Sequence, residues 1–238
     1  MLLPTEIARL LVVMAHPDDV DFGSAGTIAT LTGAGVDVTY CLVTDGNAGG
    51  SDRSVSRSDV AALRRVEQTA AAAVVGVSEL VFLGHPDGRV VADLALRCDI
   101  SRVIRQVRPQ VVLCQSPERN LDRIFASHPD HLAAGDATVS AVYPDSRNPF
   151  AFPELLEEGL EPWEVNEIWL SAHPTSTDFI DVTEHIDLKF QALRCHLSQL
   201  PDPDGMETRF REMMAINAIK AGFLEGTFVE GFRVVQAS

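Results

Sequence analysis

Strand-like and helix-like segments take turns along the first 115 residues, and this alternation limits the fold more than any other feature of the sequence. The run at residues 10–15 is entirely apolar, as expected for a strand that is covered on both faces. Strands that alternate with helices form a parallel sheet with right-handed crossovers and helices on both faces. We therefore predict an α/β protein with a Rossmann-like, mostly parallel sheet.

The predicted elements end where glycine, proline or polar residues interrupt an apolar pattern. Strands are predicted at residues 10–15, 36–43, 80–83, 111–114 and 167–171, and helices at 24–32, 60–75, 94–107, 184–199 and 206–221. No internal repeat or domain boundary is evident, so we predict one domain over residues 1–238. Residues 1–140 form its core with two polar clusters, and an irregular excursion, the fifth strand and two helices follow in 141–238.

Composition and charge disfavour several kinds of partner and location. The 238 residues are 46% hydrophobic, which is enough for a substantial core. The formal charge is −15, from 19 basic and 34 acidic residues, so nucleic acid is not an expected partner. The four cysteines form no C-x-x-C pair, which disfavours a disulfide framework or a structural zinc knot. No run approaches about 18 apolar residues and none has the form of a signal peptide, so we expect no membrane span and a cytoplasmic protein.

The first polar cluster, His16-Pro17-Asp18-Asp19, directly follows the opening strand. It supplies one imidazole and one carboxylate for a divalent metal and leaves a second carboxylate to handle a proton. Pro17 restricts the backbone of this turn. The alternative is that these residues only cap the next helix, because aspartate is a good N-cap.

The second cluster, His128-Pro129-Asp130-His131, lies in the loop after the fourth predicted strand. Ligands of parallel α/β sheets bind beyond the carboxyl ends of the strands, so we expect both clusters to meet at one edge of the sheet. Three protein ligands with an open fourth position form a catalytic zinc site. The other histidine and aspartate residues are then free to act as acid, base and orienter.

Four segments together resemble the LmbE-like, or PIG-L, de-N-acetylases: VVMAHPDDVDFGSAGTIA, RRVEQTAAAAVVGV, FLGHPDG and SHPDHLAAG. The resemblance covers at least residues 9–140. It implies the LmbE-like fold and a hydrolase that removes the acetyl group from an N-acetylglucosamine-type sugar conjugate. It also implies Zn2+ as the cofactor, and Fe2+ stays open because sites of two histidines and one carboxylate accept both ions.

The same resemblance implies roles for the two clusters. Asp18 would be the general base that takes a proton from metal-bound water. His128 would stabilise the oxyanion or protonate the leaving amine, and Asp130 would hold the imidazole of His128 in orientation. The residues implied to bind zinc are His16, Asp19 and His131.

Two further positions match substrate-contacting residues of the family, Arg64 and Asp87. The alternatives are a solvated or Glu67-paired arginine and an aspartate that only forms a turn before Gly88. Asp21 departs from the family, whose members more often carry glutamate there.

The remaining histidines have structural interpretations. His85 and His173 could lie at the edge of the site, but a structural role is preferred for both. His185 and His196 fall in a predicted helix and are expected to be structural.

Rival functions differ in their chemistry. One is an amidase that acts on a larger acyl group or a thiol conjugate. A second is a metal-dependent phosphoesterase, which the scarcity of basic residues near the clusters disfavours. A third is a nucleotide-binding module, which would need G-x-G-x-x-G after the first strand, where Ala15-His16-Pro17 stands. The expected partner is a small-molecule amino-sugar conjugate, and a homo-oligomer is left open.

Overall fold

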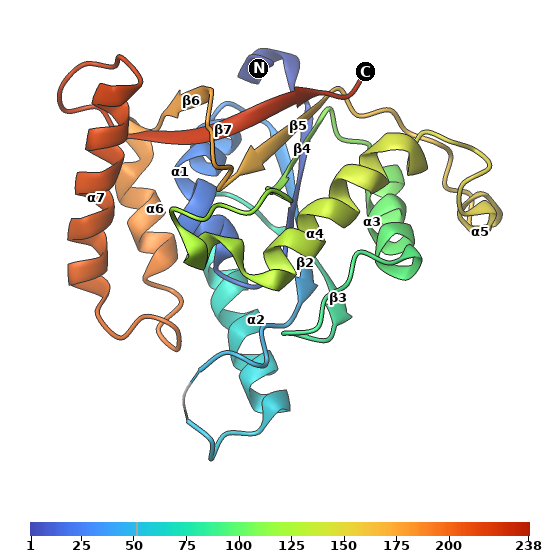
Figure 1. Cartoon of the computed structure of the whole chain (residues 1–238), viewed down its shortest axis with the longest axis horizontal. Coiled ribbons are helices and arrows are strands. Elements are labelled where there is room, and N and C mark those ends of the chain that lie inside the picture. Colours follow the sequence, from blue (N-terminus) through green and yellow to red (C-terminus); the bar gives the residue numbers. More distant parts are fainter. Residues whose placement is uncertain (51) are drawn as a thin grey trace.

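Seven strands form one sheet in the computed structural model, which describes residues 1–50 and 52–238 (Figure 1). The strands are β1 (Arg9–Met14), β2 (Asp37–Thr44), β3 (Glu79–His85), β4 (Val111–Gln115), β5 (Glu167–Ser171), β6 (Asp178–Asp181) and β7 (Val229–Gln236). Their order is β3-β2-β1-β4-β5-β7-β6. The first five are parallel and β7 runs antiparallel to both of its neighbours. The predicted mostly parallel α/β fold is confirmed.

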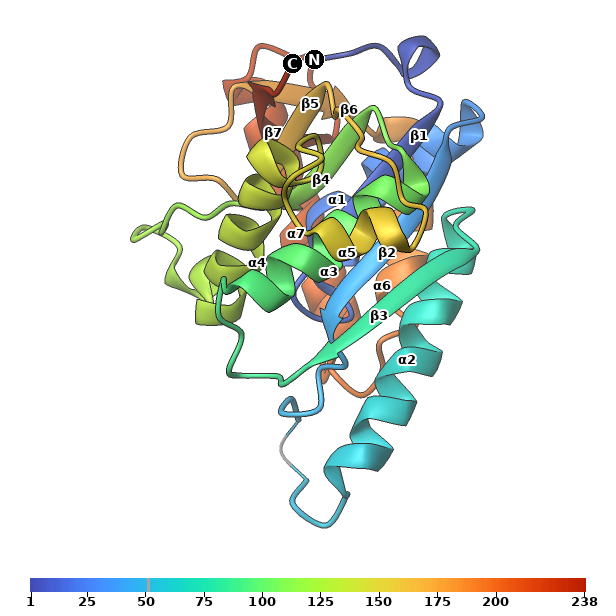
Figure 2. The ribbon, with the colours of Figure 1, turned by 90° about the vertical axis from the view of Figure 1, so that its right-hand side faces the viewer.

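Helices cover both faces of the sheet (Figures 1 and 2). One face carries α1 (Asp19–Gly33), α2 (Arg57–Val74) and α6 (Ile186–Leu193), with α7 (Pro203–Lys220) packed outside α6. The other carries α3 (Leu94–Val107) and α4 (Pro129–Ser140), with the short α5 (Pro153–Glu157) beyond them. Among the described residues, no helix is both long and apolar enough to cross a membrane.

Side chains of β1 alternate between the two cores that these helices close. Leu10, Val12 and Met14 pack toward α1 and α2, whereas Leu11 and Val13 pack toward α3 and α4. Successive side chains of a strand point to opposite faces, so a strand buried on both faces must be apolar throughout. The apolar run therefore places β1 in the middle of the sheet.

Most predicted elements are confirmed, and α3 and β5 have the predicted bounds. The helix α1 begins at Asp19 instead of residue 24, with Asp18 as its N-cap residue. The helix α2 begins three residues early, because the Ser56 side chain accepts a hydrogen bond from the Asp59 N–H group and caps it. The helix α6 ends at Leu193, so His196 lies in the turn that follows. Both β6 and β7 are missing from the predicted set.

A buried ion pair ties the C-terminal elements to α1. The Lys189 Nζ atom of α6 lies 2.7 Å from Glu230 Oε1 of β7, and both side chains are almost completely buried. Lys189 also donates to the backbone carbonyls of Asp21 and Phe22. Glu230 accepts from two backbone N–H groups in the middle of α1. The pair therefore binds the backbone of the helix that begins at Asp19.

We expect Lys189→Met to lower the free energy of unfolding by about 3–5 kcal/mol, because it leaves the Glu230 carboxylate buried without its cation. Urea unfolding followed by circular dichroism measures this change. Lys220→Met is the matched control, since it alters the only other lysine of the chain, which is exposed at the end of α7. Equal losses in the two variants would contradict the prediction.

Candidate active site

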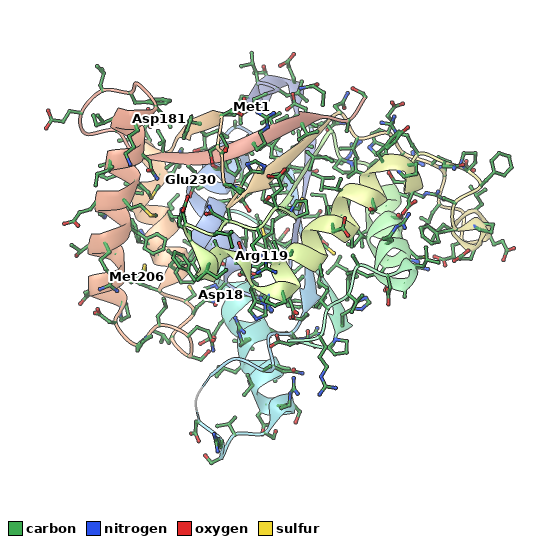
Figure 3. All side chains as sticks on the ribbon, viewed as in Figure 1. Met1, Asp18, Arg119, Asp181, Met206 and Glu230 are labelled. Atoms are coloured by element: carbon green, nitrogen blue, oxygen red, sulfur yellow. The ribbon has the colours of Figure 1, made fainter. Side chains whose placement is uncertain are left out.

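The two polar clusters meet at the carboxyl edge of the sheet, where the order of strands reverses. His16 follows β1, and His128 and His131 stand at the start of α4, in the connection after the neighbouring β4. In Figure 3 Asp18 is labelled below Met1, near the middle of the view. The chain runs from β1 outward through β2 and β3 and then returns to β4 beside β1. Ligands of such sheets bind at this reversal point.

The Asp19 carboxylate bridges two imidazoles that come from different elements. Its Oδ2 atom lies 3.2 Å from His16 Nδ1, and its Oδ1 atom lies 3.1 Å from His131 Nε2. Two atoms each about 2.0–2.1 Å from one zinc ion, at a tetrahedral angle, are about 3.3 Å apart. Each contact has about this length, and the two contacts use different oxygens of the Asp19 carboxylate.

The outer nitrogens of these imidazoles contact groups that would fix a metal ligand. His131 Nδ1 lies 3.2 Å from the carbonyl oxygen of Ala126, which leaves Nε2 toward Asp19. His16 Nε2 lies 3.2 Å from Asp87 Oδ1 and 3.3 Å from Asp130 Oδ2. A histidine that binds a metal through one nitrogen commonly donates from the other to a carbonyl or carboxylate. Both histidines have this arrangement.

The carboxylates create a field that attracts a cation. Burial acts to lower the pKa of His16, but the charge of Asp19 and hydrogen bonds to Asp130, Asp19 and Asp87 raise it to about 12. Burial acts to raise the pKa of Asp19, but His131 and His16 hold it well below its usual range. The negative charge of these carboxylates would also attract a divalent cation.

Asp18 occupies an unusual backbone conformation beside this cluster. Its φ is +86°, in the left-handed region that few residues other than glycine adopt. Its N–H group donates to Gln68 Oε1 at 2.7 Å, and Arg64 Nη2 donates to its carboxylate at 3.0 Å. Burial and the charge of Asp19 raise the pKa of Asp18 to about 7, against the opposing effect of Arg64. A carboxyl group with this pKa can exchange a proton near neutral pH.

His128 is exposed and faces the cluster edge-on, with its ring centroid 5.1 Å from that of His16. Its Nδ1 atom accepts a hydrogen bond from the backbone N–H of Asp130, so Nε2 carries the proton of the neutral ring. Burial and the nearby charge of His16 lower the pKa of His128. The imidazole can donate a hydrogen bond, and once protonated can deliver a proton, at the mouth of the site.

The expectation that Asp130 orients His128 stays a prediction, because the hydrogen bond between these two residues comes from the Asp130 backbone N–H group. The Asp130 carboxylate instead contacts His16 and accepts from the backbone N–H groups of Gly88 and Val90. Asp130 stands in the first turn of α4 with its side chain turned inward, whereas the His128 ring points outward. Only the Asp130 backbone touches His128.

A cavity of about 270 Å³ opens beside these groups, and Arg64 and Asp87 both line it. Asp87 is 7% exposed, accepts from the Ala48 N–H group and contacts His16. Arg64 is 4% exposed, and its two terminal nitrogens donate to the carbonyls of Gly46 and Pro17, as well as to the Asp18 side chain. Arg64 thus has its main partners within the protein.

Neither alternative interpretation of Arg64 holds, because it is buried and because Glu67 bonds elsewhere. Glu67 accepts from the N–H and hydroxyl groups of Ser198 in the turn after α6. The other histidines have structural partners: His85 contacts Asp99, His173 contacts Glu118, His185 contacts Thr30 and His196 contacts Asp21.

Sequence patterns do not single out Gln68, although it is fully buried and bonds to Asp18. Its Nε2 atom donates to Asp21 Oδ2 at 2.9 Å, and His196 Nε2 lies 2.8 Å from the same oxygen. Asp21 is thus the centre of a buried network. The R-x-x-E-Q spacing places Gln68 one helical turn after Arg64, which is the only signal that could have indicated it.

A second cavity, of about 370 Å³, lies at the opposite edge of the sheet, where the strands begin. Arg9, Asp37 and Glu79 line it, with no histidine among its lining residues. The larger of the two cavities is therefore not the one beside the histidine and aspartate clusters.

Comparisons with known proteins identify relatives of this chain. Residues 11–142 match the model of the family described as GlcNAc-PI de-N-acetylase, PIG-L. The diacetylchitobiose deacetylase of Thermococcus kodakarensis is 32% identical over 197 residues, which cover 83% of this chain and 72% of that protein. A probable N-acetyl-alpha-D-glucosaminyl L-malate deacetylase 2 of Bacillus anthracis is 28% identical over 202 residues, covering 80% of this chain and 81% of the relative.

A solved structure is similar over nearly the whole chain. The N,N'-diacetylchitobiose deacetylase of Pyrococcus horikoshii, complexed with its inhibitor MPG, superposes with a TM-score of 0.89 at 30% identity. The superposition covers 98% of this chain and 85% of that one. The similarity therefore extends beyond residue 142 to the C-terminal elements.

The His196–Asp21 pair predicts a pH dependence of stability. Burial acts to lower the pKa of His196, but the hydrogen bond and charge of Asp21 outweigh it, so the pKa is raised. The folded state then holds this proton more tightly than the unfolded chain, and protonation favours folding. This stabilisation is complete below about pH 6.5, the usual pKa of histidine, and is lost as pH rises through the higher folded pKa.

We therefore expect the difference in free energy of unfolding between the wild type and His196→Gln to shrink with rising pH. Urea unfolding at about pH 6 and about pH 9 measures it. A difference that stays constant or grows would contradict the assignment of the raised pKa to this pair.

Proposed function

The chain belongs to the GlcNAc-PI de-N-acetylase (PIG-L) family, and we propose that it hydrolyses the acetamide of an N-acetylglucosamine-type sugar conjugate. The observation that carries this proposal is the meeting of Asp18, Asp19 and His128 with His16 and His131 beside one cavity. Relatives with the same fold act on the acetyl groups of diacetylchitobiose and N-acetylglucosaminyl malate. The enzyme is a carbohydrate deacetylase of a metal-dependent family.

We propose that the metal is zinc, held by His16 Nδ1, Asp19 and His131 Nε2. The 3.2 and 3.1 Å contacts among these atoms support the set. Ring nitrogens of His16, His128 and His131 also lie within 4.8 Å of one another, which offers a three-imidazole alternative. The set with Asp19 is favoured because its carboxylate touches both of the other ligands. Bound zinc would lower the pKa of a coordinated water to about 7 and polarise the amide carbonyl.

Asp18 is the proposed general base. Arg64 and Gln68 hold its carboxylate and its backbone beside the metal ligands, so it need not rearrange to reach the attacking water. After attack, the same carboxyl group can return the proton to the leaving amine.

His128 is the proposed donor to the developing oxyanion or to the leaving amine. Its exposed position and its Nε2 proton support both roles, which stay open. Asp130 is proposed to act through His16, by accepting from Nε2 and fixing the ring. Asp87 remains a proposed sugar contact from the cavity wall, because a carboxylate can accept hydroxyl groups.

Acetate release tests the function. We expect the zinc-loaded protein to release acetate from diacetylchitobiose or N-acetylglucosaminyl malate and no phosphate from sugar phosphates. Release of a larger acyl group with no acetate would favour the rival amidase, and phosphate release would favour the phosphoesterase. Activity of the protein loaded with Fe2+ or Zn2+ in parallel compares the two ions.

Substitutions separate the ligands from the base. We expect His16→Ala, Asp19→Ala and His131→Ala to lower the bound zinc measured by elemental analysis, because each removes one of three ligands. We expect Asp18→Asn to keep the metal and lower kcat by roughly 100-fold to 10,000-fold, because the amide cannot accept the proton.

His185→Ala is the control, since His185 contacts Thr30 far from the cavity-lining residues and should leave the zinc content unchanged. His128→Ala should also retain zinc. Loss of zinc in His128→Ala, with zinc retained in Asp19→Ala, would instead establish the three-imidazole set.

A further inference from the structure

We propose that Gln68 is a positioning residue that holds Asp18 in its left-handed conformation and so aims its carboxylate at the reacting water. This inference rests on the proposed role of Asp18 as the general base. Gln68 is absent from the residues that line the cavity, and its side chain is fully buried. It can therefore influence the reaction only through another residue.

Asp18 needs an external partner because its backbone is strained. A residue other than glycine at a φ of +86° costs of the order of 1–3 kcal/mol and persists only where the surroundings impose it. The Asp18 N–H group donates to Gln68 Oε1 at 2.7 Å, which is the short end of the normal range. Arg64, one helical turn earlier on α2, binds the preceding carbonyl of Pro17. The helix α2 thus binds both polar groups of the single peptide that precedes this strained residue.

The orientation of the Gln68 amide is fixed by what lies at each end. The Asp18 N–H group can only donate, so it selects the oxygen Oε1. The buried Asp21 carboxylate accepts from Nε2 at 2.9 Å. Turning the amide over would place its NH2 group against an N–H donor and its oxygen against a carboxylate. The Gln68 amide therefore has a single favourable orientation, in which Oε1 accepts from the Asp18 N–H group.

Asp21 is itself held from the C-terminal part of the chain. His196 Nε2 lies 2.8 Å from the carboxylate oxygen that Gln68 contacts, and Lys189 donates to the Asp21 backbone carbonyl. His196, Asp21, Gln68 and Asp18 form one continuous set of hydrogen bonds. The conformation of Asp18 thus depends on the turn after α6.

Two single variants of Gln68 and one double variant test its hydrogen bonds to Asp18 and Asp21. Gln68→Leu removes both contacts. Gln68→Glu keeps an oxygen for the Asp18 N–H group but sets a second carboxylate against Asp21. The double variant Gln68→Glu/Asp21→Asn restores a donor opposite an acceptor, because the NH2 group introduced at position 21 can donate one hydrogen to the carboxylate at position 68. Its other hydrogen can go to His196 Nε2 when that ring is neutral and carries its proton on Nδ1. A role in positioning predicts that the double variant recovers what Gln68→Glu loses.

Gln110→Leu is the matched control. Gln110 Oε1 accepts from the backbone N–H groups of Ala8 and Arg9, at the opposite end of β1 from the active site. This variant also removes a glutamine oxygen from backbone donors, so it reports the general loss of stability. We expect it to lower the melting temperature while kcat and zinc content stay at wild-type values.

Steady-state kinetics, zinc affinity by chelator competition and thermal unfolding are measured on every variant in the zinc-loaded form. We expect Gln68→Leu and Gln68→Glu to lower kcat by about 100-fold with KM little changed, since a shift of about 1 Å in a reacting group has this effect. The double variant should recover at least about 10-fold of that loss. A kcat for Gln68→Glu equal to that of Gln110→Leu, or a double variant no better than Gln68→Glu, would overturn the proposal.

Crystal structures of Gln68→Leu and Gln68→Glu test the same idea without activity. We expect φ of Asp18 to leave the left-handed region in at least one of them, and retention of +86° in both would also overturn the positioning role. This result stands whether or not the wild type releases acetate. Failure of the wild type on every acetylated sugar would count against the proposed function, whereas an unmoved Asp18 counts against Gln68 alone.

Discussion

One carboxylate, that of Asp19, holds the active site together by contacting imidazoles from two separate segments. His16 and His131 are more than 100 residues apart in the sequence and meet only because β1 and β4 are neighbours in the sheet. His16 lies just after the end of strand β1, and His131 lies at the start of helix α4. The positions of Asp18 and Asp130 follow from this meeting, since both are neighbours of these residues in the chain, whereas Arg64 lies on α2 and Asp87 follows β3.

The sheet core and the cluster positions could be predicted because they depend on local patterns. An uninterrupted apolar run such as residues 10–15 indicates a strand covered on both faces. The two histidine-proline-aspartate clusters follow strands of one parallel sheet, so both were expected at the same edge. The partners of each side chain could not be predicted. Asp130 is two residues from His128 in sequence, yet its carboxylate contacts His16, because the first turn of α4 directs the two side chains differently. Arg64 matches a position that the family resemblance assigns to a substrate contact, but it donates to the turn at Pro17.

The C-terminal strands escaped prediction for a related reason. The strand β7 is antiparallel, contains Gly231 and pairs with β5, more than 50 residues earlier in the sequence. Its stability depends on that pairing and on the burial of Phe232 against Trp169, not on its own residue pattern. Because its partner strand is distant in the sequence, β7 was not predicted, although it contacts α1 directly through Glu230.

The Lys189–Glu230 pair bears on whether residues 11–142 could fold without the C-terminal part of the chain. Residues 11–142 match the family model and include every group assigned to the chemistry. A fragment ending there would keep the ligands but lose the ammonium and carboxylate groups that bind the α1 backbone. Two carbonyls and two N–H groups of that helix would lose these partners, on a surface left open to water. Residues beyond the family match therefore supply hydrogen bonds on which the first helix of the catalytic segment depends.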